Sequence, residues 1–250
     1  MDMRGKLTVL VASVVVLLAG TVHANSLGTV RMKYHSATPR KSATIYLNGN
    51  SLGTVYTGQY NLLLDADYTP TGEGEDVYEL AGPDYLIGAF CADVRQSAPL
   101  GKGYYLYDVR MPEDGPVVRG DPQAAMGESK ANDLRRLYGS HIDEIGTEAG
   151  AAAFQLCVWE IIDDSGYDVT SGSLYTTTTG AWVDMANTWL EDLGTTVPDV
   201  ELRILTNEDM QDYALVFDGP SAPEPITVAG ILMGLGAAGA YVRKRRVRTV

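Results

Sequence analysis

The fold is decided by residues 147–163, TEAGAAAFQLCVWEIID. Apolar residues recur there at steps of three and four, the spacing that puts side chains on one helix face; they are Ala151, Phe154, Val158, Ile161 and Ile162. Thr147 and Glu148 suit a helix start, and the polar residues 163–166 suit its end. The pattern therefore predicts one long helix over this stretch.

Strand patterns precede this helix, and helices and strands follow it. The strands expected before it are 29–35, 43–47, 52–57, 59–64, 85–94 and 104–109, with a turn signal at Asn48-Gly49-Asn50. Two further helices are expected at 121–138 and 180–193, a loop at 176–179, and closing strands at 200–205 and 213–217. This order predicts an α+β fold, with a β-rich N-terminal half, a helical insertion and closing strands.

Residues 1–24 have the layout of a secretory signal peptide. Arg4 and Lys6 form a short positive region, residues 7–19 are almost wholly apolar, and Val22-His23-Ala24 places small residues where a signal peptidase cuts. The apolar run is shorter than the roughly 20 residues of a membrane span, so an uncleaved anchor is the less favoured alternative. The mature chain is expected to begin near Asn25.

The other end of the chain predicts a membrane helix. Residues 226–242, ITVAGILMGLGAAGAYV, carry no charge, and a basic cluster follows them at Arg243, Lys244, Arg245 and Arg246, with residues up to 248 completing the basic end. An apolar helix followed by a basic cluster stops in the bilayer with the cluster in the cytoplasm. Its glycines are typical of membrane helices, where small residues allow close packing.

Pro223, Glu224 and Pro225 stand just before this span. The motif, the span and the basic cluster, in this order, resemble the PEP-CTERM sorting signal of Gram-negative bacteria. The resemblance implies that an exosortase-type enzyme processes the tail, residues 220–250, near Pro-Glu-Pro. It also implies a destination at the cell surface or in the extracellular biofilm matrix.

Residues 25–219, between the two sorting segments, suit one domain or two small ones. They hold 12 Lys and Arg against 30 Asp and Glu, a net charge of −18. A surface this acidic repels phosphate backbones, which argues against nucleic acid as a partner. Two acidic groups have oxygen atoms that suit calcium, but neither has EF-hand spacing, and a solvated acidic surface is the favoured interpretation; they are Asp65 with Asp67, and Glu73 with Glu75 and Asp76. No metal site and no cofactor are predicted.

Cys91 and Cys157 are the two cysteines. In an oxidising compartment the default expectation for two cysteines is one disulfide. A second interpretation involves Gln155, because Phe90-Cys91-Ala92-Asp93 and the helical stretch AFQLCVWE, residues 153–160, resemble the thioester domains of bacterial surface proteins. Those domains pair an aromatic-Cys pattern with a Gln motif of the kind T-Q-x-A-I-W, and sorted relatives carry A-F-Q-L-A-I-W-E. Residues 52–60 also resemble a glycine-rich strand motif of that group.

The resemblance implies that the thiol of Cys91 attacks the side-chain carbonyl of Gln155 and expels ammonia, which leaves an internal thioester. An amine or hydroxyl on a partner then attacks the thioester, so the protein becomes covalently attached, as an adhesin does, in a single-use reaction without enzymatic turnover. Holding the two groups together lowers the barrier, and a dry surround keeps water away. Phe90, Phe154 and Trp159 suit that wall, and Glu160 is expected either in solvent or in a polar network near the site.

Two alternatives remain open. Cys157 stands where the family has alanine, which allows a structural matrix protein with a Cys91–Cys157 disulfide. Residues 155 and 157 are separated by roughly 200° around a helix, at about 100° per residue, so a Gln155 that faces Cys91 turns Cys157 away. The second alternative is an extracellular cysteine hydrolase with His141 as its base, although no local motif supports one. The thioester is the favoured interpretation.

Overall fold

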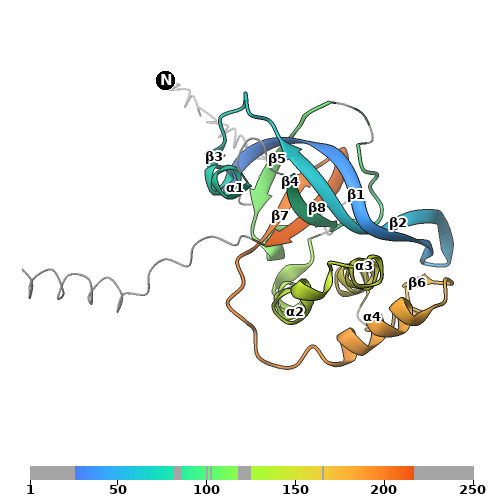
Figure 1. Cartoon of the computed structure of the whole chain (residues 1–250). Helices are drawn as coiled ribbons and strands as arrows, with labels where there is room; N and C mark the ends of the chain where they lie inside the picture. The colour runs from blue at the N-terminus through green and yellow to red at the C-terminus, as the bar shows by residue number, and fades with distance from the viewer. Residues whose placement is uncertain are drawn as a thin grey trace, which may run out of the picture.

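The structure is a computed structural model that describes residues 26–81, 86–99, 101, 103–117, 125–164 and 166–216. These residues form an antiparallel sheet that packs against helices (Figure 1), which confirms the expected α+β class. The expected signal peptide and C-terminal membrane helix lie outside this part of the chain. Within the described part, no helix combines the length and the apolar character that a bilayer crossing requires.

A long hairpin begins the sheet. β1 (Gly28–Leu47) and β2 (Asn50–Leu64) pair antiparallel, and Asn48 and Gly49 join them with φ angles of 51° and 77°, as the turn signal predicts. The expectation of two separate strands on each side of the turn was wrong. The register of β1 shifts twice within residues 34–40, and such bulges bend a strand without ending it.

The remaining strands close the sheet on itself. The order is β2-β4-β8-β7-β5-β1, and β1 also pairs with β2, so six antiparallel strands form a ring. Closure removes exposed strand edges. These strands lie within a few residues of their expected positions, at β4 (Leu86–Cys91), β5 (Tyr105–Arg110), β7 (Leu202–Asn207) and β8 (Met210–Val216). Two short strands, β3 (Thr71–Gly72) and β6 (Leu174–Thr176), pair with β1 and were not expected.

Most helices lie where they were expected, at α2 (Gly127–His141), α3 (Glu148–Asp163) and α4 (Ala181–Glu191). The expected start of α2 at residue 121 was wrong, because Ala125 and Met126 are not helical and Gly127 begins the helix with a φ of 75°. The sequence reasoning missed α1 (Glu73–Ala81), whose first turn carries three acidic residues that suit a helix N-terminus. Two short 3-10 helices span Pro112–Asp114 and Ile142–Glu144.

α3 is the centre of the molecule, with the sheet on one side and α2 and α4 beside it (Figure 1). Every residue from Gly150 through Ile162 is buried, although the pattern predicted one apolar face. A helix that is apolar on all sides is a core helix. Its start is fixed by Thr147, whose side chain accepts a hydrogen bond of 3.0 Å from the Gly150 N–H. Aromatic rings of Phe90, Tyr138 and Phe154 pack on one another between the layers.

Candidate functional site

The side chain of Gln155 pairs with the main chain of Cys91. The Cys91 N–H donates to Gln155 Oε1 at 2.8 Å, and Gln155 Nε2 donates to the Cys91 carbonyl at 2.9 Å. Both residues are buried, with 1% of Cys91 and none of Gln155 exposed. The two residues, 64 positions apart in sequence, are therefore in direct contact.

This pairing follows from the ends of two elements. Cys91 is the last residue of β4, so its N–H and carbonyl on the side away from β8 have no further strand partner. The helix α3 crosses beneath this strand end and supplies the amide of Gln155 in place of a strand. A buried amide needs partners for its donor and its acceptor, and the peptide of Cys91 provides both.

The sulfur of Cys91 lies in a largely apolar environment. The thiol donates to the main-chain carbonyl of Asp93 at 3.2 Å. Burial raises the pKa of the Cys91 thiol, while the nearby side chains of Trp159 and Gln211 act in the opposite direction. The thiol is therefore neutral at neutral pH, and its few polar neighbours are the groups that can favour a thiolate.

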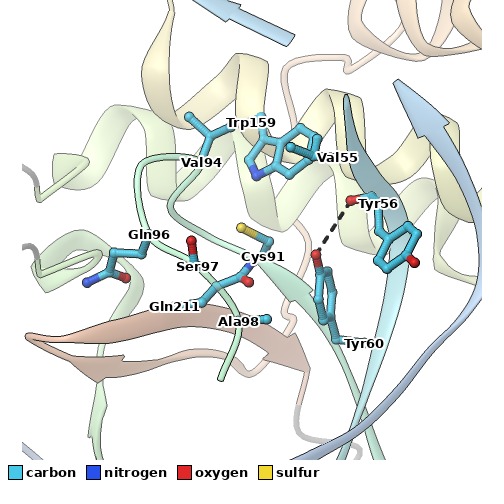
Figure 2. Close-up of a pocket in the computed structure, with 10 residues that line it drawn as sticks. All are labelled: Val55, Tyr56, Tyr60, Cys91, Val94, Gln96, Ser97, Ala98, Trp159 and Gln211. Atoms are coloured by element: carbon cyan, nitrogen blue, oxygen red, sulfur yellow. Dashed lines mark hydrogen bonds between the residues drawn. The ribbon is translucent and has the colours of Figure 1, made fainter. Parts of the chain in front are cut away.

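A pocket of about 180 Å³ leads to Cys91 (Figure 2). Its lining comes from β2, from the end of β4, from the segment of residues 94–98, from α3 and from β8, and comprises Val55, Tyr56, Tyr60, Cys91, Val94, Gln96, Ser97, Ala98, Trp159 and Gln211. None of these side chains is charged. A slim neutral group can thus reach the sulfur without contact with a charged side chain.

Hydrogen bonds of Asp93 and Gln96 hold the segment of residues 94–98 in place. Asp93 Oδ1 accepts hydrogen bonds of 2.8 Å from the N–H and the Nε of Arg95. Gln96 points away from Cys91 and donates to the Asn207 carbonyl at 3.0 Å, while its Oε1 accepts from the Asp212 N–H at 2.8 Å (Figure 2). The wall that this segment forms beside the sulfur is therefore held by polar contacts to β7 and β8.

Of the four residues expected around the thioester, only Trp159 lines the pocket. Successive residues of a strand point to opposite faces, so Phe90 points away from the side that Cys91 faces. Its ring packs on that of Phe154 with centroids 4.5 Å apart, in the hydrophobic core. These two rings support the elements that carry Cys91 and Gln155 and do not line the pocket.

Glu160 is buried, so the expectation of a solvent-facing position was wrong. Its Oε1 accepts a 3.1 Å hydrogen bond from the Asp168 N–H, and its Oε2 has no partner. Burial raises the pKa of this carboxyl to about 7. Glu160 thus holds the loop that follows α3 and does not line the pocket at Cys91.

The structure gives no support to the two alternatives. Both cysteines are free, and the thiol of Cys157 donates to the Ala186 carbonyl of α4 at 3.3 Å, on the far side of α3 from Gln155. This is the orientation that the helix geometry predicts. His141 Nδ1 lies 2.8 Å from Glu144 Oε1, and its ring stacks on Trp189 with centroids 4.5 Å apart, so it is engaged away from the pocket.

Sequence reasoning missed three neighbours of the sulfur, namely Tyr60, Gln211 and Tyr213. Tyr60 and Gln211 line the pocket, and Tyr213 is the cross-strand partner of Cys91. The abundance of tyrosine, 15 residues against 3 phenylalanines, suits half-buried strands and binding surfaces but singles out no position. Their positions depend on strand register, which no local motif encodes.

Of the acidic residues considered for calcium, Asp67, Glu75 and Asp76 are exposed, as the solvated interpretation predicted, and two others form ion pairs. Asp65 is buried and paired with Arg31, so a solvated position was wrong for it. Glu73 forms an ion pair with Arg203. Among the described residues, no cluster of histidine, cysteine, aspartate or glutamate is arranged to hold a metal ion.

A comparison with protein families and a comparison with solved structures each found a match. A family model described as the PEP-CTERM protein-sorting motif matches residues 221–246, which include Pro223-Glu224-Pro225 and the basic cluster from Arg243 to Arg246. The sorting motif predicted from the sequence is therefore confirmed. It marks proteins exported to the cell envelope or surface, so the chain is an exported surface protein.

A solved structure similar to this chain is the N-terminal thioester domain of a surface protein from Clostridium perfringens. The two are 13% identical, with a TM-score of 0.38, over 70% of this chain and 97% of the other. No curated protein was found to be significantly similar to this chain.

Proposed function

We propose that this exported surface protein forms an internal thioester between Cys91 Sγ and the side-chain carbonyl carbon of Gln155, and uses it to attach covalently to a partner. The observation that carries the proposal is the pair of hydrogen bonds between the Gln155 amide and the Cys91 peptide. They fix the amide beside the residue that bears the thiol. Two groups that are held in near-attack geometry can have the barrier to their reaction lowered by roughly 7–11 kcal/mol.

Formation of the thioester needs only these two side chains. The sulfur attacks the amide carbon of Gln155, a C–S bond forms, the C–N bond breaks, and the thiol proton leaves on ammonia. During the attack negative charge develops on Gln155 Oε1, which already accepts the Cys91 N–H at 2.8 Å. A preorganised N–H at that atom stabilises the tetrahedral intermediate.

The high pKa of the thiol sets the pace of this step. The thiolate is the nucleophile, and burial of Cys91 makes the thiolate scarce at neutral pH. Formation is therefore slow and faster at higher pH. A slow step suits a bond that is made once, during maturation, and is not regenerated in turnover.

The pocket at Cys91 is the proposed access route for the partner's nucleophile. Burial of Cys91 and Gln155 limits hydrolysis by bulk water, while the pocket admits a slim group as far as the sulfur. An amine or hydroxyl attacks the carbonyl of Gln155, the C–S bond breaks, and the proton of the nucleophile passes to sulfur. The partner is then joined to Gln155 by an amide or an ester.

The sorting tail supplies the setting for this reaction. We propose that an exosortase-type enzyme processes residues 220–250, after the predicted signal peptide 1–24 has directed export. The described domain then stands outside the cell, where an adhesive bond to a surface or matrix component is useful. A covalent bond, unlike a non-covalent contact, does not dissociate on dilution.

Intact mass of the exported protein, purified without reductant, tests the proposal. We expect a deficit of one ammonia relative to the sequence, absent in Cys91→Ala and in Gln155→Ala. Methylamine should then add stoichiometrically to the wild-type protein at Gln155, which peptide mapping locates. A wild-type mass that equals the sequence mass, or that differs by only the two hydrogens of a disulfide, would remove the proposal.

A further inference from the structure

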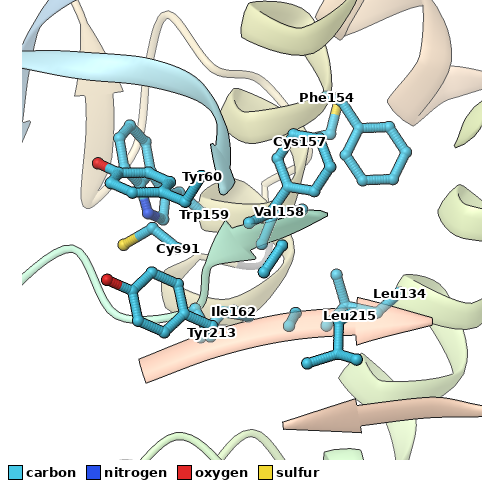
Figure 3. Close-up of a cluster of buried hydrophobic side chains, with 14 of the residues drawn as sticks. Tyr60, Cys91, Leu134, Phe154, Cys157, Val158, Trp159, Ile162, Tyr213 and Leu215 are labelled. Carbon is cyan, nitrogen blue, oxygen red and sulfur yellow. The ribbon is translucent and has the colours of Figure 1, made fainter. Parts of the chain in front are cut away.

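Two buried polar groups beside Cys91 have no hydrogen-bond partner. They are the indole N–H of Trp159, a residue 2% exposed, and the hydroxyl of Tyr213, a residue with no exposed surface. An unsatisfied buried donor costs roughly 1–3 kcal/mol, so such groups call for an explanation. Trp159 and Tyr213 come from different elements, α3 and β8, and both lie beside Cys91 (Figure 3).

Trp159 reaches the sulfur from the helix that carries Gln155. The two residues are four positions apart, so they project from the same face of α3. The indole nitrogen points into the pocket on the side of the Cys91 sulfur (Figure 2). In agreement with this placement, the Trp159 N–H lowers the pKa of the thiol against the effect of burial.

Tyr213 reaches the sulfur across the sheet. It is the direct partner of Cys91 in the β4–β8 ladder. The N–H of Cys91 is bonded to Gln155, so this is a non-hydrogen-bonded pair, the kind in which facing side chains are closest. Figure 3 shows the Tyr213 hydroxyl and the Trp159 nitrogen on the side of Cys91 to which its sulfur points.

The sulfur needs donors when it carries negative charge. In the free thiol its proton goes to the Asp93 carbonyl, and in a thioester it has no proton. When a nucleophile attacks the thioester, the C–S bond breaks and the electron pair stays on sulfur. A thiolate released into a buried site is a poor leaving group unless hydrogen-bond donors stabilise it.

We propose that the Trp159 N–H and the Tyr213 O–H donate hydrogen bonds to the Cys91 sulfur as it becomes anionic. They would so stabilise the thiolate that leaves when the partner's nucleophile attacks the thioester. The inference rests on the proposed thioester. The bond that breaks is C–S, the bond that forms joins the nucleophile to the side-chain carbonyl carbon of Gln155, and the nucleophile's proton ends on sulfur. The same two donors also stabilise the thiolate that attacks Gln155 during thioester formation.

The test uses Trp159→Phe and Tyr213→Phe, which keep an aromatic ring and remove the donor. The exported full chain is reacted with methylamine and, separately, left in buffer, and intact mass gives the rates of methylamine addition and of hydrolysis. We expect each variant to lose about tenfold or more in both rates, because a preorganised donor at a developing anion is worth up to 10²–10³ and sulfur accepts more weakly than oxygen.

Matched controls separate the donor role from packing. Trp189→Phe and Tyr107→Phe make the same changes at buried positions that do not line the pocket, and they should react at the wild-type rate. A variant that merely loosens the site would admit water and hydrolyse faster, whereas loss of a donor slows both reactions. Reaction of Trp159→Phe and Tyr213→Phe at the wild-type rate or faster would overturn the inference.

The wild-type protein separates this inference from the proposed function. A wild-type chain without the ammonia deficit removes both. A wild-type chain that forms the thioester, with variants that react as fast as it does, removes only the role of the two donors. Should Trp159→Phe fail to fold, Tyr213→Phe, at a strand position that keeps its ring, still decides the matter.

Discussion

The two cysteines are equally buried and sit in unlike surroundings. Burial raises the pKa of both thiols. Cys91, at the end of β4, has an amide bonded to its peptide, two unpartnered donors nearby and a pocket that reaches it. Cys157, between α3 and α4, has the Ala186 carbonyl as its hydrogen-bond acceptor, in a tightly packed apolar environment.

The difference teaches that burial alone does not define a reactive cysteine. A small apolar setting accepts a thiol as it accepts alanine, the residue that the resembled family has at this position. A reactive setting also needs an electrophile in place, groups that stabilise charge, and a route for the second reactant. In the proposed mechanism Cys91 has all three, and Cys157 has none of them. The predictions below either widen or erase this contrast.

The largest expected effect is all or none. Cys91→Ala should abolish both the ammonia deficit and methylamine addition, because it removes the nucleophile. Cys157→Ala should leave both unchanged, because its thiol faces α4. Intact mass before and after methylamine treatment measures each. Loss of the ammonia deficit in Cys157→Ala would show that the two cysteines act together and would end the contrast.

Stability should also separate the two cysteines. A thioester between residues 91 and 155 closes a long loop, and a cross-link of that span stabilises by about 4 kcal/mol in the chain-entropy model. Cys91→Ala loses the cross-link, whereas Cys157→Ala loses only a thiol and a weak hydrogen bond, at about 1 kcal/mol. Urea unfolding of both variants measures the difference. Equal losses would indicate that no cross-link is present.

Local patterns predicted the elements better than their connections. The apolar spacing around Phe154 gave α3, and Asn48-Gly49 gave the hairpin turn, because each depends on neighbours in sequence. The continuity of β1 through its bulges and the closure of the sheet depend on pairing between distant strands. No pattern within a short window encodes such pairing, so these features appeared only in the structure.

The candidate site divides in the same way. Cys91 and Gln155 were singled out because their flanking residues match a motif, and helix geometry alone predicted that Cys157 faces away from Gln155. Tyr213 was not found, because its place beside Cys91 follows from the register of β8. Glu160 was expected in solvent or near the site, and the fold instead buries it under the loop after α3. Motifs therefore pointed to the two residues of the proposed thioester, and the fold supplied their surroundings.

Glu160, on the same helix as Cys157, should make the free energy of unfolding depend on pH. Burial raises the pKa of Glu160 from 4.5 to about 7. Between these values the folded protein keeps a proton that the unfolded chain has lost, so the free energy of unfolding falls as pH rises through this window. The loss is about 3 kcal/mol for this group, at about 1.36 kcal/mol per pKa unit.

Glu160→Gln removes this titration and should leave the variant more stable than the wild type at pH 8. Asp163, whose pKa burial also raises to about 7, keeps part of the slope in the variant. Urea unfolding at several pH values between 5 and 8 measures both proteins, with Glu191→Gln, exposed at the end of α4, as the control. A wild-type stability that rises over this range would contradict the prediction.

The smallest effect concerns access to Cys91. Ala98 lines the pocket and is partly buried, so Ala98→Phe should narrow the route without touching Cys91 or Gln155. We expect an unchanged ammonia deficit, because thioester formation needs no second reactant, and about tenfold slower addition of methylamine, which corresponds to about 1.4 kcal/mol. Ala149→Phe, equally partly buried but at the start of α3, is the matched control and should react normally. If Ala98→Phe reacts as fast as the wild type, the nucleophile reaches Gln155 by another path, and the pocket no longer distinguishes Cys91 from Cys157.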